Sequence, residues 1–304
     1  MTMRLFLAFG GAVATVLAVF ACSDSDAGGG ASSGGPFVPE GGMILEDGAV
    51  VGPDGEIIPQ GDSAIPSKVN LTTENVTVLG NARVFVLAVP KTYDAARKYP
   101  LIIAIHGDGQ TGASLVPFLG FDAINGDEAI VAYPTIGGGD LFTPYDQNPD
   151  QQLIEVTINA VKAKLSIDDA KVWGFGYSKG GFLANEIGCR KPGILKAIAA
   201  HAAGAPQEPQ DGNFFPICPG VVGQPMLVTE GTNDTGIGGE HSARYWASVN
   251  GCGTGRSPTT PAECQKFDGC PAEKTVTYCL APGVSHYPIW SQAAAISWNW
   301  FKSL

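Results

Sequence analysis

Short apolar runs alternate with amphipathic segments along the chain from about residue 75 to the C-terminus. Apolar runs bounded by turn residues are typical of buried strands, and their alternation with helical segments predicts crossover connections in a mostly parallel sheet. The expected strands are residues 83–89, 101–105, 129–132, 171–175, 197–200, 226–229 and 275–279. The pattern therefore predicts an α/β fold with helices on both faces of a central sheet.

Three helices are expected between and after these strands. The first carries four apolar residues spaced four, three and four apart, which puts them on one helix face: Ile154, Ile158, Val161 and Leu165. The second should begin at Ser178 and end before Pro192, and the third should span residues 291–302. No internal repeat is visible, so one domain is expected over residues 44–304, with its core starting near residue 70.

The N-terminus has the pattern of a targeting segment. Arg4 supplies a positive charge, and the apolar run that follows, residues 5–20, is shorter than the ~20 residues needed to span a bilayer. Residues 1–21 are therefore predicted to be a signal peptide. The end of the segment, Val19-Phe20-Ala21-Cys22, resembles the bacterial lipobox, which implies lipid attachment at Cys22. The alternative is an ordinary signal peptide cut near Ala21.

Residues 22–43 are rich in Gly, Ser, Ala and Asp and are predicted to be a flexible tether. Behind the tether, Val50-Val51 and Ile57-Ile58 flank Gly52-Pro53-Asp54-Gly55, a pattern that suits a short hairpin in a lead-in segment. A lipid-anchored protein of this kind would be secreted to the cell surface or the periplasm. Ser23, directly after Cys22, favours the outer membrane.

The charge of the chain excludes some classes of partner. The formal net charge is −11 and the isoelectric point is about 4.7. Binding to nucleic acid needs a basic surface, and so does attachment to a membrane through a polybasic patch. We therefore expect no nucleic-acid partner, and contact with a membrane only through the N-terminal lipid.

Six cysteines remain when Cys22 is set aside, and an even number in a secreted chain predicts three disulfides. They are Cys189, Cys218, Cys252, Cys264, Cys270 and Cys279. A zinc site is the competing interpretation, but the chain has no Cys-x-x-Cys pair and its four histidines are scattered. No metal and no cofactor are expected.

A candidate nucleophile lies between an expected strand and an expected helix. The segment Gly176-Tyr177-Ser178-Lys179-Gly180 follows the strand at 171–175, which is the setting of a nucleophile elbow. The turn is so tight that the positions two before and two after the serine must lack bulky side chains, and both are glycine. The helix N-terminus behind Ser178 also directs backbone N–H groups toward its oxygen.

A serine nucleophile needs a histidine base and a carboxylate that orients the histidine, in the chain order serine, acid, histidine. His286 lies in a glycine-led loop after the last expected strand and is the predicted base. His201 comes too early to leave an acid between it and Ser178, and His241 starts a predicted surface helix; a structural loop histidine at 286 is the alternative. Asp234, just past the strand at 226–229, is the predicted acid.

Two further assignments leave alternatives open. Glu230 is the rival acid, and Asp234 could instead cap a short helix. One oxyanion donor should be the amide of Lys179, directly after the nucleophile. The second is assigned to the amide of Asp108 in His106-Gly107-Asp108-Gly109, with Gly109 as the alternative. His106 itself is expected to be a buried residue that holds this turn.

Four motifs together resemble a group of secreted esterases that contains feruloyl esterases, acetylxylan esterases and polyhydroxybutyrate-depolymerase-like lipoproteins. They are His106-Gly107-Asp108-Gly109, Gly176-Tyr177-Ser178-Lys179-Gly180-Gly181, Gly231-Thr232-Asn233-Asp234 and Gly283-Val284-Ser285-His286. The resemblance covers residues 75 to 304 and implies the α/β-hydrolase fold. It also implies that Cys252 pairs with Cys270, Cys189 with Cys218, and Cys264 with Cys279.

The resemblance implies a serine esterase that acts on feruloyl or acetyl esters of plant polysaccharide. A polyhydroxybutyrate depolymerase is the alternative with the same chemistry, and a catalytically silent surface-binding lipoprotein is the alternative from a different class. Two departures from the group's pattern lie next to the expected reaction site. Lys179 stands where a small or apolar residue is more usual, and Tyr287-Pro288 follows the histidine in place of the commoner arrangement.

Overall fold

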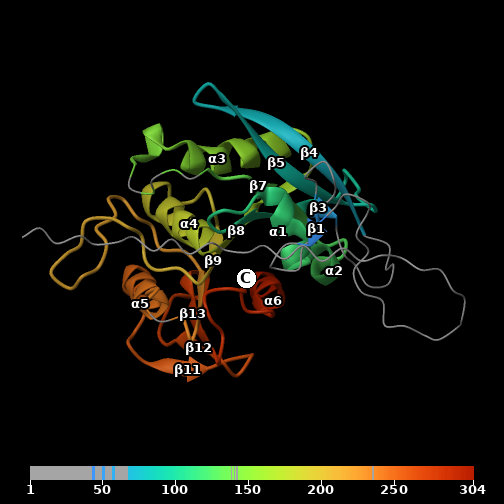
Figure 1. Cartoon of the computed structure of the whole chain (residues 1–304). Helices are drawn as coiled ribbons and strands as arrows, with labels where there is room; N and C mark the ends of the chain where they lie inside the picture. The colour runs from blue at the N-terminus through green and yellow to red at the C-terminus, as the bar shows by residue number, and fades with distance from the viewer. Residues whose placement is uncertain are drawn as a thin grey trace, which may run out of the picture. The chain divides into compact units, whose positions relative to one another are not determined.

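The computed structural model in Figure 1 describes residues 43–44, 50–51, 57–58, 68–137, 139, 141, 143–234 and 236–304. The predicted signal peptide (1–21), Cys22 and the tether up to residue 42 lie outside these residues. The chain divides into two compact units, Met1–Gln60 and Gly61–Leu304. In the first, β1 (Met43–Ile44), β2 (Val50–Val51) and β3 (Ile57–Ile58) form an antiparallel sheet, so the expected hairpin at residues 50–58 is present.

The second unit contains a ten-stranded sheet in the order β11-β12-β13-β10-β9-β8-β6-β7-β5-β4. The six strands from β13 to β7 run parallel, and the strands at both edges are antiparallel. The strands are β4 (Val69–Val78), β5 (Asn81–Pro90), β6 (Tyr99–Ile105), β7 (Ile130–Pro134), β8 (Ile167–Tyr177), β9 (Ala197–His201), β10 (Met226–Gly231), β11 (Arg256–Pro258), β12 (Cys264–Phe267) and β13 (Val276–Ala281).

All seven expected strands are present in this sheet, as β5 to β10 and β13. The expected helices are present as α3 (Pro149–Lys162), α4 (Lys179–Arg190) and α6 (Ala293–Lys302), and the surface helix expected near His241 is α5 (Gly239–Val249). Leu165, expected on the apolar face of the first helix, lies beyond the end of α3. The helices α1 (Gly112–Leu119) and α2 (Phe121–Asn125) and the 3₁₀ turns η1 (Tyr145–Gln147) and η2 (Ala272–Lys274) complete the described elements.

The hydrophobic core consists of two layers, one on each face of the sheet. Alternate residues of β6 point to opposite layers: Leu101, Ile103 and Ile105 pack with α3, α4 and α5, whereas Ile102 and Ala104 pack with α1, α2 and α6. A strand that is buried on both faces reads as a continuous apolar run, which is why β6 is conspicuous in the sequence. Because the six central strands are parallel, their carboxyl ends all lie on the same side of the sheet, between the two helix layers.

Three disulfides connect the second unit: Cys189–Cys218, Cys252–Cys270 and Cys264–Cys279. These are the pairings that the resemblance implies. Cys264 and Cys279 lie directly opposite each other on β12 and β13, so this bridge joins the antiparallel edge to the parallel core. Within the described residues, no helix has the length and apolar character needed to cross a membrane.

Candidate active site

Ser178 occupies a sharp turn between β8 and α4. Its φ and ψ are 52° and −121°, a backbone conformation that costs a non-glycine residue on the order of 1–3 kcal/mol. Surrounding hydrogen bonds hold it there: its N–H donates to the carbonyl of His201, and its carbonyl accepts from the N–H groups of Gly181 and Phe182. The strained turn lifts the Ser178 side chain out of the sheet at the carboxyl ends of the parallel strands.

The two glycines of the motif are required by close backbone contacts. A Cβ at Gly176 would lie 2.3 Å from the carbonyl oxygen of Gly180. A Cβ at Gly180 would lie 2.3 Å from the carbonyl oxygen of Ile105 and 2.6 Å from that of His106. Only a residue without a side chain lets the start of α4 approach the end of β6 this closely.

Ser178, His286 and Asp234 come together although they are far apart in the chain. Ser178 Oγ lies 2.8 Å from His286 Nε2, and His286 Nδ1 lies 3.1 and 3.0 Å from the two carboxylate oxygens of Asp234. An ionised carboxylate can only accept a hydrogen bond, so Nδ1 carries the proton and Nε2 accepts from the serine hydroxyl. The Asp234 side chain is buried, whereas the imidazole is 41% exposed. This arrangement can take the proton from Ser178 and stabilise the resulting imidazolium.

Tyr177, the residue directly before Ser178, also contacts His286. Its hydroxyl donates to the carbonyl oxygen of His286 at 2.6 Å, and its ring lies 5.8 Å from the imidazole and 6.1 Å from the ring of Phe118. Burial raises the pKa of Tyr177 to about 12, so the hydroxyl remains a donor at neutral pH. The sequence analysis did not identify this residue as part of the site.

The expected oxyanion donors lie on two neighbouring turns. In the described part of the chain, the backbone N–H groups of Lys179 and Asp108 donate to no protein acceptor. The Lys179 ammonium lies 3.3 Å from the Asp108 carboxylate, and this ion pair joins the turn after β6 to the start of α4. Gly109 has a φ of 72°, which bends the turn back on itself. Two free amides on adjacent turns can bind a developing negative oxygen.

His106 is buried and links two loops. Its Nε2 accepts from the N–H of Ile136 at 3.0 Å, so Nδ1 carries the proton and donates to the carbonyl of Gly107 at 2.6 Å. Burial lowers the pKa of His106, so the imidazole is neutral near pH 7. The residue holds the turn that carries Asp108, in the role expected for it.

The rival residues have other partners in the described structure. His201 is fully buried between Thr229 and Ser297, and burial lowers its pKa to about 3. The Glu230 carboxylate accepts from two N–H groups at the start of α5 and from the hydroxyl of Tyr278. His241 bonds to the carbonyl of Phe214. In the described structure, no side-chain hydrogen bond joins Ser178 to His201, His241 or Glu230, and His201 meets Ser178 through its backbone carbonyl.

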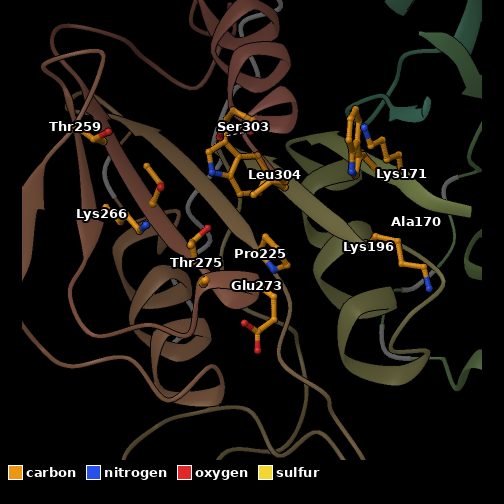
Figure 2. A pocket seen from close by; sticks show the side chains of 14 residues that line it. Ala170, Lys171, Lys196, Pro225, Thr259, Lys266, Glu273, Thr275, Ser303 and Leu304 are labelled. Atoms are coloured by element: carbon orange, nitrogen blue, oxygen red, sulfur yellow. Dashed lines mark hydrogen bonds between the residues drawn. The ribbon is translucent and has the colours of Figure 1, made fainter. Parts of the chain in front are cut away.

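A hollow lies at the opposite ends of the parallel strands from this site. Figure 2 shows side chains that line it. It lies at the amino ends of the parallel strands and is lined by residues that include Lys171, Lys196, Lys266 and Trp300. Because Ser178, Asp234 and His286 follow the carboxyl ends of β8, β10 and β13, this hollow cannot present a substrate to them.

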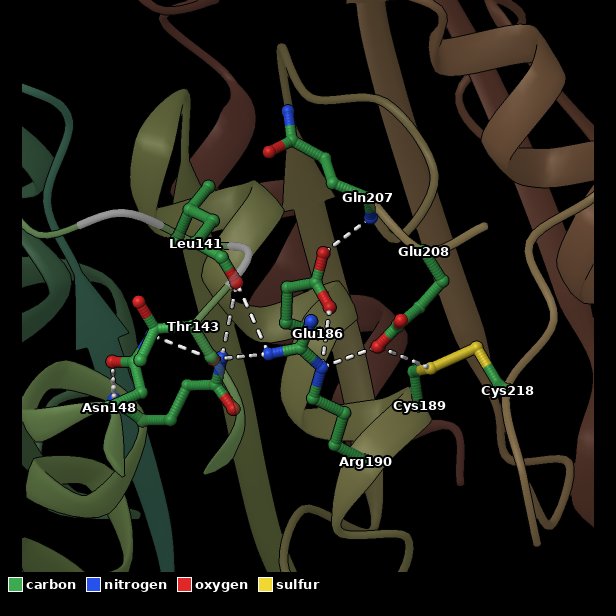
Figure 3. A network of polar contacts seen from close by, with 10 residues as sticks. Leu141, Thr143, Asn148, Glu186, Cys189, Arg190, Gln207, Glu208 and Cys218 are labelled. Atoms are coloured by element: carbon green, nitrogen blue, oxygen red, sulfur yellow. Dashed lines mark hydrogen bonds and ion pairs between the residues drawn. A yellow bond between two sulfur atoms is a disulfide. The ribbon is translucent and has the colours of Figure 1, made fainter. Parts of the chain in front are cut away.

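The C-terminal half of α4 and the loop after β9 share a largely buried cluster of charges (Figure 3). The Arg190 guanidinium lies between the carboxylates of Glu186 and Glu208, and the Glu186 carboxylate accepts from the N–H of Gln207. Among the described residues, Glu186, Cys189 and Glu208 have the spacing of a metal site. Cys189 is in a disulfide and the Arg190 guanidinium already pairs with both carboxylates, so this set does not fit a cation.

We expect Glu186→Gln to change how stability depends on pH. Burial raises the pKa of Glu186 from 4.5 to about 7. The N–H of Gln207 and the charge of Arg190 lower this pKa in part, and the charge of Glu208 raises it further. Tyr245 also lies near the Glu186 carboxylate. The folded protein therefore binds a proton that the unfolded chain releases between pH 4.5 and 7, and the wild type loses stability over this range. Glutamine cannot ionise, so the variant should not lose this stability. As the pH rises from 5 to 8, its unfolding free energy should increase relative to that of wild type by up to about 3 kcal/mol.

Urea unfolding at the two pH values measures this difference, with the exposed Glu128→Gln as the matched control. Equal changes in the unfolding free energy of wild type and Glu186→Gln between pH 5 and pH 8 would contradict the expectation.

Comparison with known proteins finds relatives that are named esterases. No family model matches the chain. Among curated proteins, "Probable feruloyl esterase C" of Aspergillus terreus is 27% identical over 209 residues, which cover 62% of this chain and 72% of the relative. "Feruloyl esterase B" of Piromyces equi is 26% identical over 182 residues, which cover 53% of this chain but only 34% of that longer protein.

Solved structures share the fold at lower identity. An acetyl xylan esterase from Aspergillus awamori superposes with a TM-score of 0.61 at 17% identity and covers 77% of this chain and 100% of its own. A ferulic acid esterase from Anaeromyces mucronatus, solved with ferulic acid, has a TM-score of 0.54 at 17% identity and covers 81% and 94%. The solved structures show the α/β-hydrolase fold for this chain, and its similarity to curated feruloyl esterases supports a carboxylic-ester hydrolase.

Proposed function

We propose that the chain is a secreted serine esterase that uses Ser178, His286 and Asp234 to hydrolyse feruloyl or acetyl esters of plant polysaccharide. The observation that carries the proposal is the continuous hydrogen-bonded path from Ser178 Oγ through the imidazole of His286 to the carboxylate of Asp234. A serine on a strained turn, paired with an oriented imidazole, is the arrangement that activates a hydroxyl as a nucleophile.

In this mechanism Ser178 Oγ attacks the ester carbonyl carbon while its proton passes to Nε2 of His286. Asp234 stabilises the imidazolium, and the amides of Lys179 and Asp108 bind the negative oxygen of the tetrahedral intermediate. Collapse of the intermediate breaks the bond to the alcohol, which takes the proton from His286 and leaves an acyl ester on Ser178. Water then attacks this ester by the same steps and releases the acid.

The substrate class is supported by the relatives and by one surface feature. The curated relatives are named feruloyl esterases, and one neighbour is an acetyl xylan esterase. Next to His286, the ring of Tyr287 is 51% exposed and stacks on Phe118 at 6.1 Å with an interplanar angle of 8°. A rigid aromatic surface beside the reacting atoms suits an aromatic acyl group such as a hydroxycinnamate.

The location is part of the same proposal. Three disulfides fit an oxidising, extracellular compartment. The lipid anchor at Cys22 rests on the sequence of the lipobox alone. Incorporation of labelled palmitate into wild type but not into Cys22→Ser would test it.

The substrate is tested by a panel of methyl ferulate, acetylated xylan and hydroxybutyrate oligomers. We expect the highest kcat/KM on the feruloyl or acetyl esters, and preference for hydroxybutyrate oligomers would replace this substrate class with a polyester. Labelling with a fluorophosphonate probe accompanies the panel. A folded wild type that neither labels nor hydrolyses any ester would indicate a silent binding protein instead.

A further inference from the structure

A cleft of about 550 Å³ lies next to the Ser178 turn. One wall begins with Phe182, one helical turn after Ser178, and the opposite wall is Ile237 to His241, shortly after Asp234. The third wall is the loop from Gly204 to Gln210, which follows β9. The cleft is thus bounded by the residues that follow two members of the site, and its volume is within the usual range for ligand pockets.

The lining combines apolar surface with hydrogen-bonding side chains. Phe182, Pro206, Pro209 and Ile237 supply the apolar part, and side chains that include Gln207, Gln210 and His241 supply donors and acceptors. Among the described residues that line the cleft there is no lysine or arginine, and the acid among them, Glu208, is paired with Arg190. Amide side chains beside apolar surface match a sugar ring, which has hydroxyl groups at its edge and C–H groups on its faces.

The loop that forms the third wall is held rigidly although it contains no helix or long strand. Asn185 donates to the carbonyl of Gly204 at 2.8 Å. Figure 3 shows two further contacts: the Glu186 carboxylate accepts from the N–H of Gln207, and Arg190 pairs with Glu208. The Cys189–Cys218 disulfide closes the far end. All four contacts come from α4, the helix that begins at Ser178, so the wall and the serine share one support. Such preorganisation reduces the entropic cost of binding.

The same loop has a strained, exposed aromatic residue. Phe214 has a φ of 63° and is 71% exposed. Its conformation is maintained by the Asp211 carboxylate, which accepts from the N–H groups of Asn213 and Phe215, and by His241, which bonds to the Phe214 carbonyl at 2.9 Å. Strained backbone conformations are found most often at functional sites, so the strain at the exposed Phe214 supports a contact with a ligand.

We propose that this cleft is a subsite for a neutral glycosyl unit on the alcohol side of the ester, and that Phe214, whose carbonyl bonds to the lining residue His241, extends it. The inference rests on the proposed esterase function and adds which part of the substrate is recognised and where. It assigns binding of the sugar to Gln207, Gln210 and Phe214, residues that take no part in the proton transfers.

The test compares two esters of the same acid. In the double variant Gln207→Ala/Gln210→Ala and in Phe214→Ala, kcat/KM for a feruloylated arabinoxylan oligosaccharide should fall about tenfold or more, with methyl ferulate unchanged within about twofold. Gln265→Ala, an exposed glutamine on β12, is the matched control and should change neither rate. An equal loss of kcat/KM on both esters would indicate that the cleft binds the acyl group. No loss on either ester would indicate that the cleft binds no part of the substrate. Either result overturns the proposal.

A binding measurement separates this inference from the proposed function. Calorimetry with the wild type and an acyl-free arabinoxylan oligosaccharide should show binding that both sets of substitutions weaken about tenfold or more. If the wild type hydrolyses no ester but binds the sugar in this way, the proposed function fails and the subsite stands. If hydrolysis is normal and the variants bind the sugar as well as wild type does, only the subsite is wrong.

Discussion

Ser178→Ala is expected to lower kcat/KM for every ester substrate by ~10⁴-fold or more and to abolish labelling by a fluorophosphonate. The substitution removes the only atom that the mechanism uses to form the acyl-enzyme. Backbone contacts hold the turn independently of the hydroxyl, through the bonds from Ser178 N–H to His201 and from Gly181 and Phe182 to the Ser178 carbonyl. The unfolding free energy should therefore stay within about 1 kcal/mol of wild type.

Ser285→Ala is the matched control for this variant. Ser285 is exposed and directly precedes His286, but its hydroxyl has no part in the hydrogen-bonded path from Ser178 to Asp234. The activity of the Ser285→Ala variant should be close to that of wild type. Retention of more than about one per cent of wild-type activity by a folded Ser178→Ala would remove the serine from the mechanism.

Gly180→Ala should strongly lower the stability of the protein. The added Cβ would meet two carbonyl oxygens at the end of β6, those of Ile105 and His106, at 2.3 and 2.6 Å. Backbone atoms in the centre of a sheet cannot move aside as a flexible side chain can, so α4 must shift. Overpacking of this kind costs about 3 kcal/mol or more. The shift also displaces Ser178 and the amide of Lys179, so turnover should fall sharply.

Urea unfolding and ester turnover measure the two effects together. Gly212→Ala is the control, because a Cβ there would have no neighbour within 4 Å. A Gly180→Ala protein with wild-type activity and an unfolding free energy within about 0.5 kcal/mol of wild type would show that the close approach of α4 to β6 is not required.

The sequence predicted the centre of the sheet because burial on both faces leaves a clear pattern. The strands β6 to β10 read as apolar runs followed by turn residues, and Ser178, Asp234 and His286 could be selected from the turns after β8, β10 and β13. Chain order and spacing were enough to name these three residues. The structure brings them within hydrogen-bonding distance of one another.

Elements at the edges could not be predicted in the same way. Most residues of β4 are exposed or half-buried, and its sequence, VNLTTENVTV, has no long apolar run. The short strands β11 and β12 are polar, and they are positioned by pairing with β13 and by the Cys264–Cys279 bridge. The cleft beside Ser178 was also missed, because its walls come from three segments of the chain whose contacts are long-range.

The hydrogen bond from Tyr177 to the His286 carbonyl bears on how the site tolerates motion. Tyr177 is the last residue of β8 and precedes Ser178, so the bond ties the backbone of the base directly to the support of the nucleophile. A shift of the loop after β13 relative to the sheet is then transmitted to both reacting groups. The distance between Ser178 Oγ and His286 Nε2 should vary less than the position of the loop itself. The Tyr177 hydrogen bond therefore restricts movement of the His286 backbone relative to the turn that carries Ser178.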